Sequence, residues 1–191
     1  MSKKLIKGGV IERYTTKVKK IMEQYGNMPI MSGVVTRTPI WGSLKKILYI
    51  ITMGQSLKAH DEYFHLSVIV TLNDGNKISI EKNATINMDV NNFPEINKDT
   101  QYINIPNIQG QTINEMLERE RLQLGNDKFF KYRPFEENCQ HMIQHFLSAS
   151  NLLTKELNDF IYQDMKQIIE SVPSWVKTLS NVVFDLANYA F

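Results

Sequence analysis

The sequence has only one cysteine, Cys139, among its 191 residues. A single thiol cannot form an internal disulfide, and it cannot supply a zinc site that needs several thiolates. We therefore expect neither a structural metal nor a cofactor, and the fold does not require an oxidising compartment. The thiol of Cys139 is then either a buried packing group or a reactive one.

The chain also lacks an excess of charge, with 22 basic and 20 acidic residues and a formal net charge of +2. A nucleic acid held mainly by charge is therefore not an expected partner. No apolar run reaches the roughly 18–20 residues of a spanning helix, and no apolar segment follows the basic start of the chain. These absences predict a cytoplasmic globular domain without a signal peptide or a transmembrane helix.

Helical patterns occur in the first part of the chain. Apolar residues recur at helical spacing over residues 12–25, and Gly26 and Asn27 then supply a stop signal. The mostly apolar run 43–53 predicts a buried helix, with a strand as the alternative. We expect residues 1–40 to form a helical extension ahead of the main domain.

A turn signal at residues 73–75, Asn-Asp-Gly, is flanked by β-branched and aromatic residues on both sides. This combination predicts a β-hairpin with strands over about 63–72 and 76–82. Residues 101–108 alternate in polarity and predict a further strand, which Pro106 confines to an edge or ends early.

The type of turn decides which side chains of the hairpin meet. If residues 73–75 form a three-residue loop with Gly75 in the left-handed conformation, Ser67 faces Glu81. His65 then lies diagonally next to the Glu81 carboxylate, within reach of such long side chains. A two-residue turn instead puts Glu81 on the opposite face, and the sequence leaves both registers open.

The second half of the chain is mainly helical in pattern. A charged surface helix is predicted over 112–124, and two further helices over about 154–170 and 174–188. Between them, Asn138 fits the N-cap position of another helix. Cys139 is then the first residue of that helix.

Three residues form a candidate catalytic group. The first turn of a helix has unpaired backbone amides and a positive dipole end, which favour the reactive thiolate form of Cys139. His65, a polar ring in an otherwise apolar strand, is the candidate base, and His60 is a weaker one. Glu81, the one acidic residue inside the second strand, could hold the imidazole in the required tautomer.

Each of these residues also has a purely structural interpretation. Cys139 could be a small buried hydrophobic residue, His65 a hydrogen-bonded core histidine and Glu81 a charge that protects a sheet edge. His141 and His145 lie one helical turn apart, but the glutamate of a zincin motif is missing between them. We therefore expect surface histidines there and no metal site.

The order of parts is a strand histidine, a hairpin with an acidic residue, and a late Asn-Cys-Gln-His segment that opens a helix. It resembles the circularly permuted papain-like group, the NlpC-like branch that includes lecithin retinol acyltransferase. The resemblance covers roughly residues 63–147, with Met142 where those families have Phe. It implies an α+β fold in which an antiparallel sheet packs against the cysteine helix. The catalytic core would span 41–150, with C-terminal helices over 151–191 packed on the core or on a surface.

The resemblance implies thiol-dependent acyl transfer or hydrolysis. Cys139 would attack an acyl or amide carbonyl, His65 would protonate the leaving group, and Glu81 would orient the ring. The backbone amide of Cys139, with Tyr132 or Asn138, would meet the oxyanion or the substrate. Proteins or peptides are the expected substrates, because lipid-acting relatives often have a second histidine where this chain has Glu81. Acyl lipids are the alternative.

Other partners and locations follow from the same resemblance. Lipid-acting relatives often carry a hydrophobic C-terminal anchor, and residues 174–188 have an apolar stripe, although few basic residues flank it. This leaves a membrane surface as a further partner. The chain is also similar to proteins of large DNA viruses, which implies a host cytoplasm or virion location. A non-catalytic virion or binding protein that retains the fold is the alternative from another class.

Overall fold

A five-stranded antiparallel sheet, in the order β4-β3-β2-β1-β5, forms the centre of the fold. The computed structural model describes residues 13–39, 64–94, 96–133, 137–162 and 174. The strands are β1 (Ile30–Pro39), β2 (Phe64–Leu72), β3 (Lys77–Lys82), β4 (Ile86–Val90) and β5 (Gln101–Asn104). The helices are α2 (Thr16–Tyr25), α4 (Ile113–Leu124), α5 (Asn126–Phe130), α6 (Cys139–Ala149) and α7 (Lys155–Ile161).

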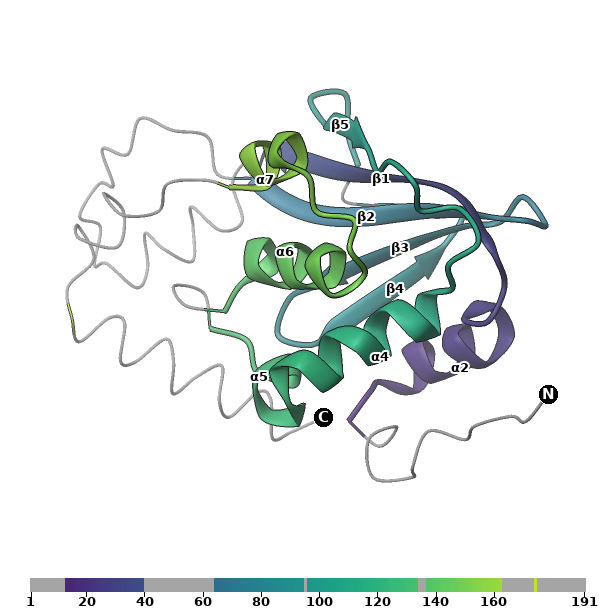
Figure 1. Ribbon diagram of the computed structural model, residues 1–191, viewed down its shortest axis with the longest axis horizontal. Coiled ribbons are helices and arrows are strands. Elements are labelled where there is room, and N and C mark those ends of the chain that lie inside the picture. Colours follow the sequence, from purple (N-terminus) through teal and green to yellow (C-terminus); the bar gives the residue numbers. More distant parts are fainter. Residues whose placement is uncertain (1–12, 40–63, 95, 134–136, 163–173, 175–191) are drawn as a thin grey trace.

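The expected α+β fold, with the cysteine helix against an antiparallel sheet, is confirmed. Helix α6 packs across β2 and β3, while α7 contacts β1 and α2 contacts β4 (Figure 1). Alternate residues of the central strands are fully buried beneath the helices: Leu66, Val68, Val70, Ile78 and Ile80. Burying each such side chain contributes about 1.5–3 kcal/mol relative to leaving it in water.

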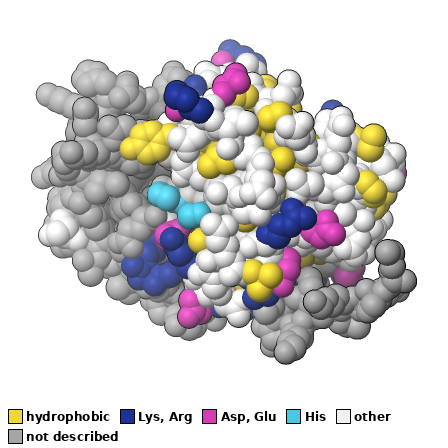
Figure 2. Space-filling model, in the orientation of Figure 1, with side chains coloured by type: hydrophobic (Ala, Val, Ile, Leu, Met, Phe, Trp, Pro, Cys, Tyr) yellow, Lys and Arg dark blue, Asp and Glu magenta, His cyan; other side chains and the backbone are white. Residues whose placement is uncertain are grey.

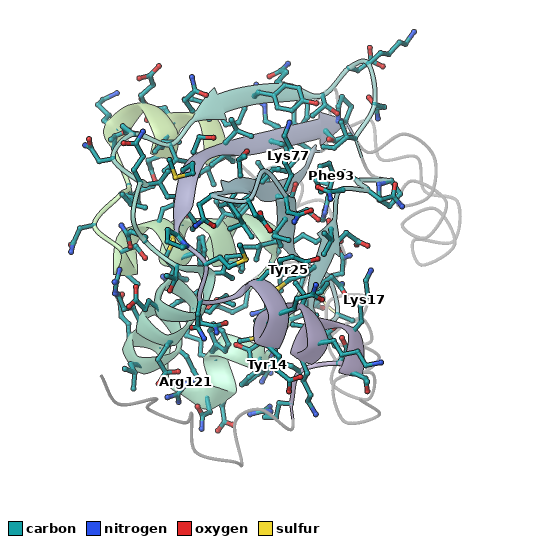
Figure 3. All side chains as sticks on the ribbon, turned by 90° about the vertical axis from the view of Figure 1, so that its right-hand side faces the viewer. Tyr14, Lys17, Tyr25, Lys77, Phe93 and Arg121 are labelled. Carbon is teal, nitrogen blue, oxygen red and sulfur yellow. The ribbon has the colours of Figure 1, made fainter. Side chains whose placement is uncertain are left out.

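Helix α2 covers the β4 edge of the sheet. Thr15 caps it by accepting a hydrogen bond from the backbone N–H of Val18 at 3.3 Å. Lys17 forms an ion pair with Asp89 of β4, so that the helix and the strand are joined by charge as well as by apolar contact (Figure 3). The predicted helix over 12–25 is confirmed.

The hairpin between β2 and β3 has the three-residue loop. Gly75 has a φ of 86°, a left-handed conformation that favours glycine. The backbone N–H of Leu72 donates to the carbonyl of Asn76 at 2.8 Å and closes the loop. In this register Ser67 pairs with Glu81. The turn therefore puts Glu81 on the strand face that it needs to meet His65.

Several other predictions agree with the structure. Helix α4 lies within the predicted 112–124, and β5 is an edge strand that ends before Pro106. Helix α7 lies within the predicted 154–170 but is shorter, because it ends at Ile161 and Tyr162 is extended, and residues 163–170 lie outside the described residues. The helix expected over 43–53 lies outside the described residues, as does the one over 174–188 apart from Ser174.

Three elements differ from the expectation. Residues 30–39 fall in the expected helical extension, but they form β1, which lies inside the sheet between β2 and β5. Strand β4 and the five-residue helix α5 were also not predicted. Their sequences are short, or their apolar periodicity is interrupted. Their conformation therefore depends on contacts with neighbouring elements and not on a local signal.

Candidate active site

Cys139 is the first residue of α6, as predicted, and its side chain is 9% exposed. The helix begins there because Asn138 is its N-cap. The Asn138 Oδ1 atom accepts hydrogen bonds from the backbone N–H of Gln140 at 3.0 Å and from His141 Nδ1 at 3.1 Å. The sulfur therefore lies at the positive end of an eleven-residue helix.

His65 lies at the end of the sheet, near the start of β2. It pairs with Thr38 of β1, whereas the β2–β3 ladder begins two residues later, at Ser67. Its Nε2 atom is 2.8 Å from Oε2 of Glu81. The ring also makes a hydrogen bond with Cys139, and Nδ1 is the ring nitrogen that remains for the sulfur.

Three elements bring these groups together. Strand β2 begins, β3 ends and α6 begins at the same end of the sheet (Figure 1). Cys139 and His65 are separated by more than seventy positions in the sequence, yet the packing of α6 across β2 and β3 makes them neighbours. The structure thus places Cys139, His65 and Glu81 in one hydrogen-bonded series.

The charges around His65 favour its protonated form. Burial of the ring lowers its pKa, but the hydrogen bonds and charges of Cys139 and Glu81 outweigh burial and raise the pKa to about 10. The ring is therefore an imidazolium at neutral pH. A histidine ring held next to a cysteine is the arrangement that nucleophilic chemistry by a thiol requires.

Glu81 is held from both sides, and the second contact was not predicted. Its Oε2 atom faces His65, and its Oε1 atom accepts a hydrogen bond from Nδ2 of Asn83 at 3.1 Å. The carboxylate side chain is 12% exposed and that of His65 is 15% exposed. The spacing of Glu81 and Asn83 by two residues is the only sequence signal for this contact, and it is a weak one.

The two residues expected near the oxyanion lie in different surroundings. Burial and the negative charge of the Cys139 thiolate both raise the pKa of Tyr132, so the phenol is neutral and close to the sulfur. The side-chain oxygen of Asn138, Oδ1, already accepts the hydrogen bond that caps α6. Of the two residues, Tyr132 is the one whose pKa responds to the sulfur.

The other histidines do not join this group. His60 lies outside the described residues. Burial lowers the pKa of His141 and of His145, and the nearby Lys128 charge lowers both further. Histidine side chains lie beside basic ones on the molecular face seen in Figure 2.

Within the described ranges, no group of three or more histidine, cysteine or acidic side chains could hold a metal ion. Among the helices of those same ranges, none is long and apolar enough to cross a membrane. Comparisons with family models, with curated protein sequences and with solved structures returned no match.

Proposed function

We propose that this protein is a thiol-dependent hydrolase of the permuted papain-like type, acting on an amide bond of a protein or peptide. The observation that carries the proposal is the hydrogen-bonded series of Cys139, His65 and Glu81. A cysteine that serves only as core packing needs neither a histidine nor an acidic residue behind that histidine. Here both are present, and the sulfur lies at a helix N-terminus.

The reaction would begin with attack of the Cys139 thiolate on the substrate carbonyl. The new carbon–sulfur bond produces an oxyanion, which the backbone N–H of Cys139 and the hydroxyl of Tyr132 can stabilise. The imidazolium of His65 then gives its proton to the leaving nitrogen as the carbon–nitrogen bond breaks. A thioester and a free amine result.

Water would complete the cycle. The neutral His65 ring takes a proton from a water molecule, whose oxygen attacks the thioester carbonyl. The carbon–sulfur bond breaks, a carboxylic acid is released, and the thiolate–imidazolium pair is restored. Glu81 keeps Nε2 occupied throughout, so that Nδ1 remains directed at the sulfur and the reacting atoms.

A labelling experiment tests the proposal. An electrophilic acyl probe should label the wild-type protein and fail to label Cys139→Ser, and His65→Gln should label at least about tenfold more slowly. His145→Gln serves as the matched control, because it removes a histidine from the same helix as the cysteine without touching the series. Labelling of wild type and His65→Gln at equal rates would refute the proposal.

The substrate class is tested separately. A peptide library and mixed phospholipid vesicles are incubated with wild-type protein and with Cys139→Ser, and products are identified by mass spectrometry. Cleaved amide bonds that depend on Cys139 support the proposal. Cys139-dependent release of fatty acid would instead indicate a lipid-acting enzyme. Probe labelling without turnover of either substrate would favour a non-catalytic role for the fold.

A further inference from the structure

We infer that Asn83 is a positioning residue of the proposed active site, which acts through Glu81 on His65. The inference rests on the proposed function and extends the catalytic series by one member. Its basis is the contact between Nδ2 of Asn83 and Oε1 of Glu81, at 3.1 Å. The other carboxylate oxygen of Glu81 lies 2.8 Å from the ring of His65.

The geometry shows why a second contact matters. A glutamate side chain has three rotatable bonds, and one hydrogen bond to His65 leaves the carboxylate free to turn about that contact. A contact at each oxygen fixes the plane of the carboxylate. The ring of His65, which interacts with Cys139, is then fixed as well.

The same contact also holds the carboxylate against the ring. The Asn83 amide donates to Oε1 of Glu81, which keeps Oε2 directed at Nε2 of His65. A carboxylate held in this position stabilises the imidazolium of His65. Asn83 therefore favours the thiolate–imidazolium pair over the neutral pair of thiol and imidazole.

The position of Asn83 on the chain suits this role. It directly follows β3, and its backbone N–H donates to the carbonyl of Thr85 at 3.0 Å, which fixes the turn into β4. Its side chain is thus carried by a hydrogen-bonded turn. Asn87 of β4 offers a close comparison. It pairs with Glu81 across the two strands, but its side-chain amide donates to the same Thr85 carbonyl, at 3.4 Å, and not to the carboxylate.

Thiolate absorbance in the ultraviolet gives a substrate-free test. Because the sequence has one cysteine, the thiolate signal reports Cys139 alone. The fraction of thiolate at pH about 7 is measured in wild type, Asn83→Ala and Asn87→Ala. We expect Asn83→Ala to lower the ratio of thiolate to thiol about three- to tenfold, as for loss of one ordinary hydrogen bond, and Asn87→Ala to leave it unchanged.

A second arm tests whether Asn83 acts through Glu81. In the Glu81→Gln background the carboxylate is absent, so adding Asn83→Ala should change the ratio by less than about twofold. A full Asn83 effect in that background would overturn the inference. So would an unchanged ratio in Asn83→Ala, or an equal loss in Asn87→Ala. If wild type itself shows no more thiolate than a free cysteine, the thiolate–imidazolium pair of the proposed function fails, and the inference fails with it.

Discussion

The pKa of His65 depends on two acidic neighbours, Cys139 in α6 and Glu81 in β3. A buried imidazole by itself would be neutral, because burial penalises the charged form. Cys139 and Glu81 reverse that tendency and raise the pKa of the ring to about 10. In the proposed function, the reactivity of the cysteine is therefore a property of the whole group and not of the thiol alone.

Glu81→Gln tests the contribution of the carboxylate. Removing a negative charge 2.8 Å from the ring should lower the pKa of His65, because the imidazolium loses one of its two stabilising partners. Proton NMR titration of the ring, assigned with His65→Gln, measures the change, and a decrease of about one to two pH units is expected. Turnover should fall less with Glu81→Gln than with His65→Gln. The opposite ranking would mean that the two roles are exchanged.

Tyr132→Phe tests the neighbouring phenol. If its hydroxyl stabilises the oxyanion, the variant should lose about tenfold or more in turnover number while its thiolate absorbance at neutral pH changes little. The reason is that the hydroxyl is needed for a charge that forms only during the reaction. Equal turnover numbers for Tyr132→Phe and wild type would leave Tyr132 as a packing residue.

Part of this group could be predicted from the sequence. The position of Cys139 follows from the capping preference of Asn138, and the place of Glu81 follows from one choice of turn at Gly75. The contact of Asn83 with Glu81 depends on side-chain rotamers after the end of β3, which sequence spacing does not determine. The nearness of Tyr132 to the sulfur depends on how α5 and α6 each pack on α4, which is a tertiary property.

At the scale of elements, one cap fixes where α6 begins. Asn138→Ala removes the acceptor for the Gln140 N–H and should lower the free energy of unfolding by about 1 kcal/mol. It should also slow alkylation of Cys139, since fraying of the first turn weakens the helix field at the sulfur. Asn138→Ser retains a capping oxygen and should keep most of both properties. If Asn138→Ala and Asn138→Ser change the free energy of unfolding and the alkylation rate equally, the capping oxygen does not fix the start of α6.

The loop between β2 and β3 fixes the register of the hairpin. Gly75→Ala puts a Cβ at a φ of 86°, and no atom lies within 4 Å of that Cβ. The loss of stability should therefore come from backbone strain alone and amount to about 1 kcal/mol in urea unfolding. A variant as stable as wild type would show that the loop does not need a left-handed residue.

The element pattern explains which parts of the fold were predictable. The hairpin and helices α2, α4 and α6 have clear turn, capping or periodicity signals. Strand β1 carries Ser32 and Gly33 near its start, where a register irregularity also occurs, and these residues interrupt the strand pattern. Its place in the sheet comes from pairing with β2 and β5, which are distant in sequence.

In the molecule as a whole, two buried ionisable groups influence each other electrostatically between the sheet and the helices. Lys82 of β3 and Glu120 of α4 are 4% and 1% exposed. Burial lowers the pKa of Lys82 to about 8 and raises that of Glu120 to about 8. Lys82 Nζ also donates to the carbonyl of Phe129 at 2.8 Å, whereas Oε2 of Glu120 is without a partner.

Lys82→Met removes the amine whose charge lowers the pKa of Glu120, so the pKa of that buried carboxyl should rise further. We expect the variant to lose stability at pH about 9, where Glu120 begins to ionise. The loss should shrink as the pH falls, because Glu120 has a raised pKa in the folded state. Its protonated form is compatible with burial, so the stability that it supports is present at low pH and disappears as the pH rises through that pKa.

The double variant Lys82→Met with Glu120→Leu is the control. It replaces both charges by apolar groups and should recover most of the stability at pH about 9. Urea unfolding of the single and double variants at pH about 5 and about 9 measures both effects. A single variant with a loss that is independent of pH would show that Lys82 acts through its hydrogen bond to Phe129 and not through Glu120.

If the His65 ring activates the Cys139 sulfur, the rate at which the native protein is alkylated depends on that ring. Iodoacetamide is allowed to react with wild type and His65→Ala at pH about 6, where a free thiol with its pKa near 8.5 is almost fully protonated. Because the chain has a single cysteine, the rate reports Cys139 alone. The thiolate–imidazolium pair predicts that wild type reacts at least about tenfold faster than His65→Ala. Equal alkylation rates for wild type and His65→Ala would show that the ring does not activate the sulfur.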